Sequence, residues 1–115
     1  MRTILFFIVA TVVSITARAG EPVRAFEPVT GAEVFEKWCS SCHSKGREYP
    51  GTLALDARYK GAVPGALEER TDLTPGLITY FVRNGISVMP FFRKTEISDH
   101  QLDLLNTYLI KKEEK

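Results

Sequence analysis

Two cysteines three residues apart, followed directly by a histidine, constrain this 115-residue chain more than any other feature. They are Cys39, Cys42 and His43, and the sequence contains no other cysteine. A disulfide between them would close a very short loop, so it would remove little entropy from the unfolded chain. A domain of this size forms only a modest core and usually needs a further stabilising device. We therefore expect something other than a disulfide to complete the core.

The pattern C-x-x-C-H is the attachment sequence of c-type haem, in which both thiols add to vinyl groups and the histidine ligates iron. A thioredoxin-like redox pair would need a βαβ context, and the sequence shows none. A zinc site would need four ligands, and the only other histidine is His100. We therefore predict one covalent haem c, bound through Cys39 and Cys42, with His43 as an iron ligand.

The first nineteen residues have the pattern of a secretory signal peptide. Arg2 precedes an apolar run at residues 4–15, and Ala17-Arg18-Ala19 forms an A-x-A cleavage site. The run is shorter than the ~20 residues that a membrane-spanning helix needs. We predict cleavage after Ala19, a single domain at residues 20–115, a periplasmic location and no membrane attachment after cleavage.

Composition excludes several other classes of protein. The chain is 44% hydrophobic and 25% charged, which is ordinary for a globular domain and excludes disordered and collagen-like chains. Removing Arg2 and Arg18 leaves 13 positive and 14 negative side chains. This balance provides no basic surface for nucleic acid.

Three segments have the periodicity and the capping residues of helices. They begin at Thr30, Thr74 and Ser98, and the first and last also carry Glu or Gln three residues later, which completes a capping box. Asn84-Gly85 provides a stop for the second helix. The apolar faces are Gly31, Val34, Phe35 and Trp38; Leu77, Ile78, Phe81 and Val82; and Leu102, Leu105, Tyr108 and Leu109.

The segment from residue 44 to residue 73 has mixed signals. Pro-Gly pairs and single glycines interrupt any long element, so only short helices at residues 54–60 and 64–70 are expected. Because no segment alternates as a strand would, we predict a small all-α fold.

Met89 is the predicted second axial ligand of the iron. His–Met ligation is typical of cytochromes c, and Met89 is the only methionine after the predicted signal peptide. Pro90 restricts the backbone of Met89 to an extended conformation and stiffens the loop. The alternative ligand is His100, whose position in a helix-capping box favours a solvated side chain.

At these residues the chain resembles class I cytochromes c. The resemblance rests on Gly31, Val34 and Phe35, on the Met89-Pro90 loop, and on Leu105 with Tyr108 near the C-terminus. It implies that the first and last helices cross around a covalently bound haem.

Residues 49–55, 58–61, 70–74 and 83–93 further resemble the cytochrome subunit of para-cresol methylhydroxylase and related 4-alkylphenol-oxidising flavocytochromes. That resemblance implies a flavoprotein dehydrogenase subunit as partner and a periplasmic electron acceptor such as a small copper protein. This chain would then transfer single electrons and perform no substrate chemistry. Alternatives are a free carrier that serves several partners and, with an open sixth iron site, a ligand sensor or peroxidase.

Some further roles rest on the resemblance or on residue type. The resemblance implies that the Pro50 carbonyl accepts a hydrogen bond from His43, although Pro50 can equally well just end a turn. Arg58, Tyr59 and Arg93 are candidate donors to the haem propionates by type and position. Exposed side chains in solvent are the alternative for all three.

Overall fold

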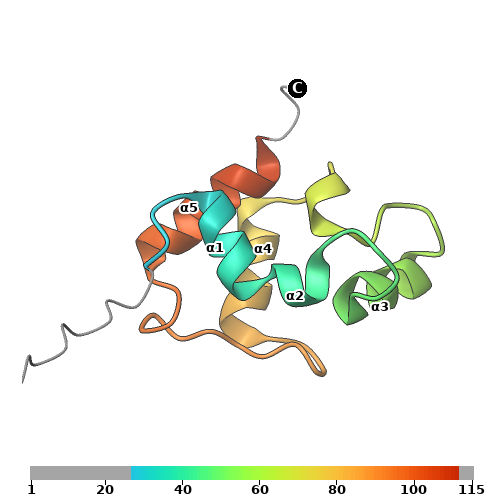
Figure 1. The fold of residues 1–115 in the computed structure, drawn as a ribbon, viewed down its shortest axis with the longest axis horizontal. Coiled ribbons are helices and arrows are strands. Elements are labelled where there is room, and N and C mark those ends of the chain that lie inside the picture. The colour runs from blue at the N-terminus through green and yellow to red at the C-terminus, as the bar shows by residue number, and fades with distance from the viewer. Residues whose placement is uncertain (1–26, 112–115) are drawn as a thin grey trace, which may run out of the picture.

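The structure is a computed structural model that describes residues 27–111, and these residues form helices joined by loops (Figure 1). Its elements are α1 (Gly31–Trp38), α2 (Ser40–His43), α3 (Pro50–Tyr59), the 3-10 turn η1 (Leu67–Glu69), α4 (Pro75–Asn84) and α5 (Asp99–Ile110). Residues 27–111 contain no named strand, so the predicted all-α fold is confirmed. The predicted signal peptide at residues 1–19 lies outside the described residues.

The three helices predicted from periodicity begin at the predicted caps. The Thr30 hydroxyl accepts from the Glu33 N–H (3.2 Å), and the Ser98 hydroxyl accepts from the Gln101 N–H (3.1 Å). Both capping boxes are complete, because the Glu33 and Gln101 side chains accept in return from the cap N–H groups. Helix α4 ends at the predicted Asn84, and the chain leaves it through Gly85, which has a φ of 67°.

The core lies where α1 crosses α5, with α4 packed against α5 (Figure 1). A Cβ on Gly31 would lie 2.2 Å from the Leu104 carbonyl oxygen and 2.5 Å from the Tyr108 Cβ, so only glycine permits this approach. The crossing implied by the resemblance is therefore confirmed. The buried core cluster consists of Val34, Phe35, Ile78, Val82, Ile97, Leu102, Leu105 and Leu109.

The middle of the chain differs from the sequence expectation. The helix expected at residues 54–60 begins earlier, because Pro50 occupies the first helical position, where its missing N–H costs nothing. The helix expected at residues 64–70 is only the short turn η1. In Figure 1, α3 lies at the opposite side of the molecule from the α1–α5 crossing.

Within residues 27–111, no helix has both the length and the apolar character needed to cross a membrane.

Candidate functional site

The two cysteines lie at the bend between α1 and α2. Cys39 caps α1, and its carbonyl accepts from the N–H groups of Cys42 (3.1 Å) and His43 (2.9 Å). Residues three apart on such a helical turn project from the same face. Both thiols are free, which sets aside the disulfide alternative in this structure. Burial, and to a smaller extent the neighbouring Cys42, raises the pKa of Cys39 to about 12, so this thiol is protonated at neutral pH.

His43 ends α2 and is half-buried. Burial lowers the pKa of its imidazole, which favours the neutral form that ligates metals. Its Nδ1 atom is buried and has no hydrogen-bond partner. The bond to the Pro50 carbonyl implied by the resemblance is therefore absent. Pro50 is the first residue of α3, and a carbonyl in that position points along the helix axis.

Gly51 is a site residue that the sequence analysis missed. A Cβ at this position would lie 2.7 Å from His43 Cε1 and 2.8 Å from His43 Nδ1, so the first turn of α3 packs directly on the imidazole. The sequence signal was the Pro50-Gly51 pair, which we interpreted as a break. A helix start that fits closely against the ring restricts the orientation of the ring.

Trp38, the last residue of α1, also has a buried nitrogen without a hydrogen-bond partner. Its ring meets Phe92 edge-on, with centroids 5.7 Å apart, and its Nε1 atom is buried without a hydrogen bond. Buried donors without partners are rare in folded proteins because each costs free energy. Two buried nitrogens without partners thus flank the cysteine pair, Nε1 of Trp38 and Nδ1 of His43. These orphaned groups and the free thiols are compatible with a bound polar cofactor.

Met89 lies in the loop between α4 and α5. The Met89 N–H donates to the Ile86 carbonyl (2.9 Å), and the Ile86 N–H donates to the Met89 carbonyl (3.1 Å), so these residues close a tight turn. Met89 is half-buried, whereas Val88 beside it is 95% exposed. The turn thus leaves Met89 partly covered and its neighbour in solvent. The alternative ligand, His100, is exposed in the first turn of α5.

The candidate propionate donors lie in two separate segments of the chain. Arg58 and the buried Arg70 both lie over the Tyr59 ring, at 5.9 and 4.6 Å from its centroid. Arg93 is an exposed residue whose Nε lies 3.7 Å from the Glu96 carboxylate. The sequence analysis did not name Arg70 as a candidate donor. In the structure its guanidinium pairs with the Asp72 carboxylate.

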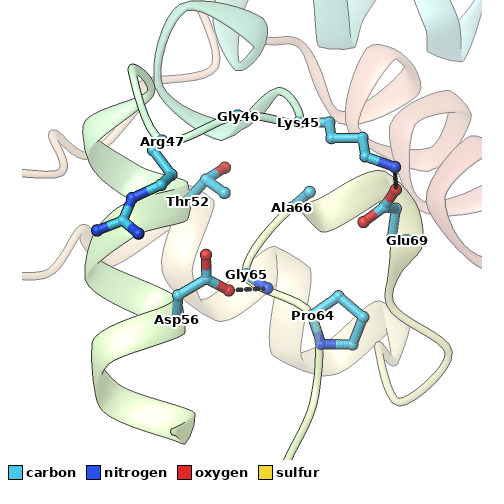
Figure 2. Close-up of a pocket in the computed structure, with 9 residues that line it drawn as sticks. All are labelled: Lys45, Gly46, Arg47, Thr52, Asp56, Pro64, Gly65, Ala66 and Glu69. Atoms are coloured by element: carbon cyan, nitrogen blue, oxygen red, sulfur yellow. Dashed lines mark hydrogen bonds and ion pairs between the residues drawn. The ribbon is translucent and has the colours of Figure 1, made fainter. Parts of the chain in front are cut away.

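A cavity of about 270 Å³ lies between α3 and the segments 45–47 and 64–69. Figure 2 shows the Asp56 carboxylate accepting from the Gly65 N–H (2.8 Å) and the Lys45 ammonium paired with Glu69 (2.6 Å). None of the four predicted site residues lines this cavity. In the described part of the chain, no three His, Cys, Asp or Glu side chains gather as a metal cluster.

Comparison with known proteins identifies the family. Residues 27–109 match the family described as "Cytochrome C oxidase, cbb3-type, subunit III". The chain is also 29% identical to a "Cytochrome c6" of Synechococcus sp. (strain ATCC 27167 / PCC 6312), over 100% of this chain and 96% of that relative. No solved structure matches the chain at a comparable level. The family match covers most of the sequence, so the protein belongs to this cytochrome c family and is a class I c-type cytochrome, a haem protein that carries electrons.

Proposed function

We propose that this protein is a periplasmic carrier of single electrons that binds one haem c covalently through Cys39 and Cys42, with His43 and Met89 as the axial ligands. The observation that carries the proposal is the pair of free thiols on the turn that leads into the half-buried imidazole of His43, whose pKa is lowered by burial. The predicted signal peptide supports the location, because exported domains are those that carry such a leader.

Each of these residues has a separate physical role. When bound, the haem supplies a reversible one-electron change at iron. Cys39 and Cys42 would anchor it by two thioether bonds, and the close packing of Gly51 on the His43 ring would restrict the orientation of that ligand. The thioether of Met89 is a soft ligand that favours ferrous iron and so raises the reduction potential. We expect the close packing at the α1–α5 crossing to limit changes of shape between oxidation states, so that little reorganisation accompanies electron transfer.

Covalent attachment is tested by denaturing electrophoresis of the purified mature protein. Haem should remain with the polypeptide, and the mass should include both the haem and the loss of residues 1–19. The Cys39→Ser variant should retain a single thioether and mature poorly. Extraction of all the haem into acidified acetone would contradict the proposed attachment.

The assignment of Met89 is tested by Met89→Ala, with His100→Ala as the matched control. We expect Met89→Ala to abolish the thioether-to-iron absorption of the oxidised protein, to lower the potential and to open the iron to cyanide. His100→Ala should leave all three properties unchanged, because His100 is exposed on α5. If only His100→Ala produced these changes, His100 would be the ligand.

We further propose that the partner is a flavoprotein dehydrogenase that oxidises 4-alkylphenols, with this chain as its haem subunit. The resemblance of residues 83–93 to such flavocytochrome subunits supports this partner. Residues 85–92 are uncharged, and Ile86, Val88 and Phe91 are 54, 95 and 58% exposed. Permanent complexes bury apolar, charge-depleted surfaces of this kind. A periplasmic acceptor such as a small copper protein would then receive the electrons.

Co-expression with the flavoprotein tests the partner. The two proteins should elute as one complex that survives high salt, because apolar contacts are not screened. Val88→Lys should break the complex, whereas Val29→Lys, at an exposed site before α1, should not. Complete separation at moderate ionic strength, with electron transfer that slows steeply as salt rises, would instead identify a free carrier guided by charge.

A further inference from the structure

The loop that carries Met89 is held to the helices at few points. Its tip is closed only by the two bonds between Ile86 and Met89, and the side chains around that tip are largely exposed. Where the thioether lies therefore depends on where the loop rejoins the folded body. It rejoins at Phe92, three residues after Met89, where the Phe92 N–H donates to the Val82 carbonyl (2.7 Å) at the end of α4.

The carbonyl of Phe92 is bound by a single side chain, Arg83, in the last turn of α4. One guanidinium nitrogen, Nη1, donates to the Phe92 carbonyl (3.0 Å) and to the Ile97 carbonyl (2.9 Å). The other, Nη2, donates to the Asp99 carboxylate (3.0 Å) in the first turn of α5. One planar group thus joins the end of α4, the middle of the loop and the start of α5.

The two bonds to carbonyls are partly shielded from water, because the Arg83 side chain is only 19% exposed, whereas the Asp99 carboxylate is 62% exposed. A hydrogen bond from a charged donor to a carbonyl is stronger than a neutral one, and its loss leaves a desolvated acceptor unpaired. Lysine would keep the charge but lose the fork geometry that serves three acceptors at once. The requirement at this position is therefore for arginine and not only for positive charge.

From this geometry we infer that Arg83 is a positioning residue. Its hydrogen bonds hold the end of the Met89 loop against α4 and the start of α5, and so set how firmly the thioether holds the iron. This inference rests on the proposed function, in which Met89 is an axial ligand. Loss of these hydrogen bonds should leave the helix crossing intact, because none of them reaches α1. It should weaken the retention of Met89 on the iron.

The experiment uses the haem-loaded protein and imidazole as a competing iron ligand. Imidazole binding is followed by loss of the thioether-to-iron absorption, and the reduction potential is measured on the same samples. We expect Arg83→Met to bind imidazole about tenfold more tightly than the parent protein and to have a lower potential, because two carbonyls lose a charged donor. Arg83→Lys should change both properties in the same direction but less.

Two control variants separate positioning from general destabilisation. Asp99→Asn removes the exposed carboxylate that pairs with Arg83 and Lys94, and it should leave imidazole affinity within about twofold of the parent, as exposed ion pairs contribute little. Ser98→Ala loosens the start of α5 without touching Phe92. An Arg83→Met protein with parental imidazole affinity would overturn the inference. So would a Ser98→Ala protein with the same gain in affinity at an equal loss of stability.

The outcome also separates this inference from the proposed function. If Met89→Ala abolishes the thioether-to-iron absorption and Arg83→Met leaves imidazole affinity unchanged, only the role of Arg83 is wrong. If Met89→Ala retains that absorption, the ligand assignment is wrong and the inference falls with it. Should Arg83→Met fail to mature, Arg83→Lys decides the question, because a parental affinity in that variant contradicts the need for a guanidinium.

Discussion

The α1–α5 crossing and the Met89 loop are stabilised in opposite ways. At the crossing, Val34 and Leu105 are fully buried, and Gly31 lets α1 approach α5 so closely that no side chain fits between them. In the loop, Ile86, Val88 and Phe91 are exposed, and the chain is held by backbone hydrogen bonds and by Arg83. Packing thus maintains the frame, whereas a few directed bonds position the proposed iron ligand. Regions with few buried apolar contacts open at lower free energy, so the loop should yield before the crossing does.

The strongest way to break the crossing is Gly31→Ala. The new methyl group would overlap a backbone oxygen of α5 at 2.2 Å, which a side-chain rotation cannot relieve. We expect a loss of about 3 kcal/mol in the free energy of unfolding, in the range of severe overpacking. Urea unfolding followed by circular dichroism measures it. The control is Gly76→Ala, where no atom lies within 4 Å of the new methyl group and stability should not fall.

Ser98→Ala weakens the start of α5, where the loop joins the helix crossing, and its effect should be smaller than that of Gly31→Ala. This change removes the hydroxyl that accepts from the Gln101 N–H and should cost about 1 kcal/mol of stability. Thermal unfolding measures the loss, with Thr107→Ala on the exposed face of α5 as the control. Equal melting temperatures for the two variants would show that the cap contributes nothing to stability.

A pH series tests the side of the crossing that faces η1. Burial, assisted by a hydrogen bond to the Glu68 carboxylate, raises the pKa of Tyr108 to about 12. The unfolded tyrosine titrates near 10, so this contribution is complete below pH 10 and is lost as pH rises toward 12. Unfolding by urea at pH 9 and pH 11 should show the parent losing stability. Tyr108→Phe should show a smaller loss, and an identical loss would contradict the role of Tyr108.

The smallest effect is expected from Lys94→Ala in the loop. The ammonium lies 2.6 Å from the Asp99 carboxylate, but both side chains are mostly exposed. The nearby cations lower the pKa of Asp99, Lys94 before Arg83, yet exposed pairs are screened by water and salt. We expect no measurable change in melting temperature. A clear loss at low salt that vanishes at high salt would show that charge, as well as the Arg83 bonds, holds the loop.

The sequence alone determined the frame of this protein and the identity of the residues proposed to hold the cofactor. Helices α1, α4 and α5 could be predicted because their caps and apolar faces are short-range signals, readable within a few residues of each helix. The cysteine pair, His43 and Met89 could be named because the spacing of the pair and the scarcity of methionine leave few alternatives.

Only the tertiary structure decided the surroundings of those residues. Gly51 against His43, the orphaned Nδ1 atom, and Arg83 between Phe92, Ile97 and Asp99 all depend on where separate elements meet. Local propensity does not encode such contacts, because each joins residues of different elements that only the packing of the chain brings together. The start of α3 at Pro50 was missed for a related reason. A Pro-Gly pair permits either a turn or a helix start, and the packing of that turn against His43 accompanies the helix that is observed.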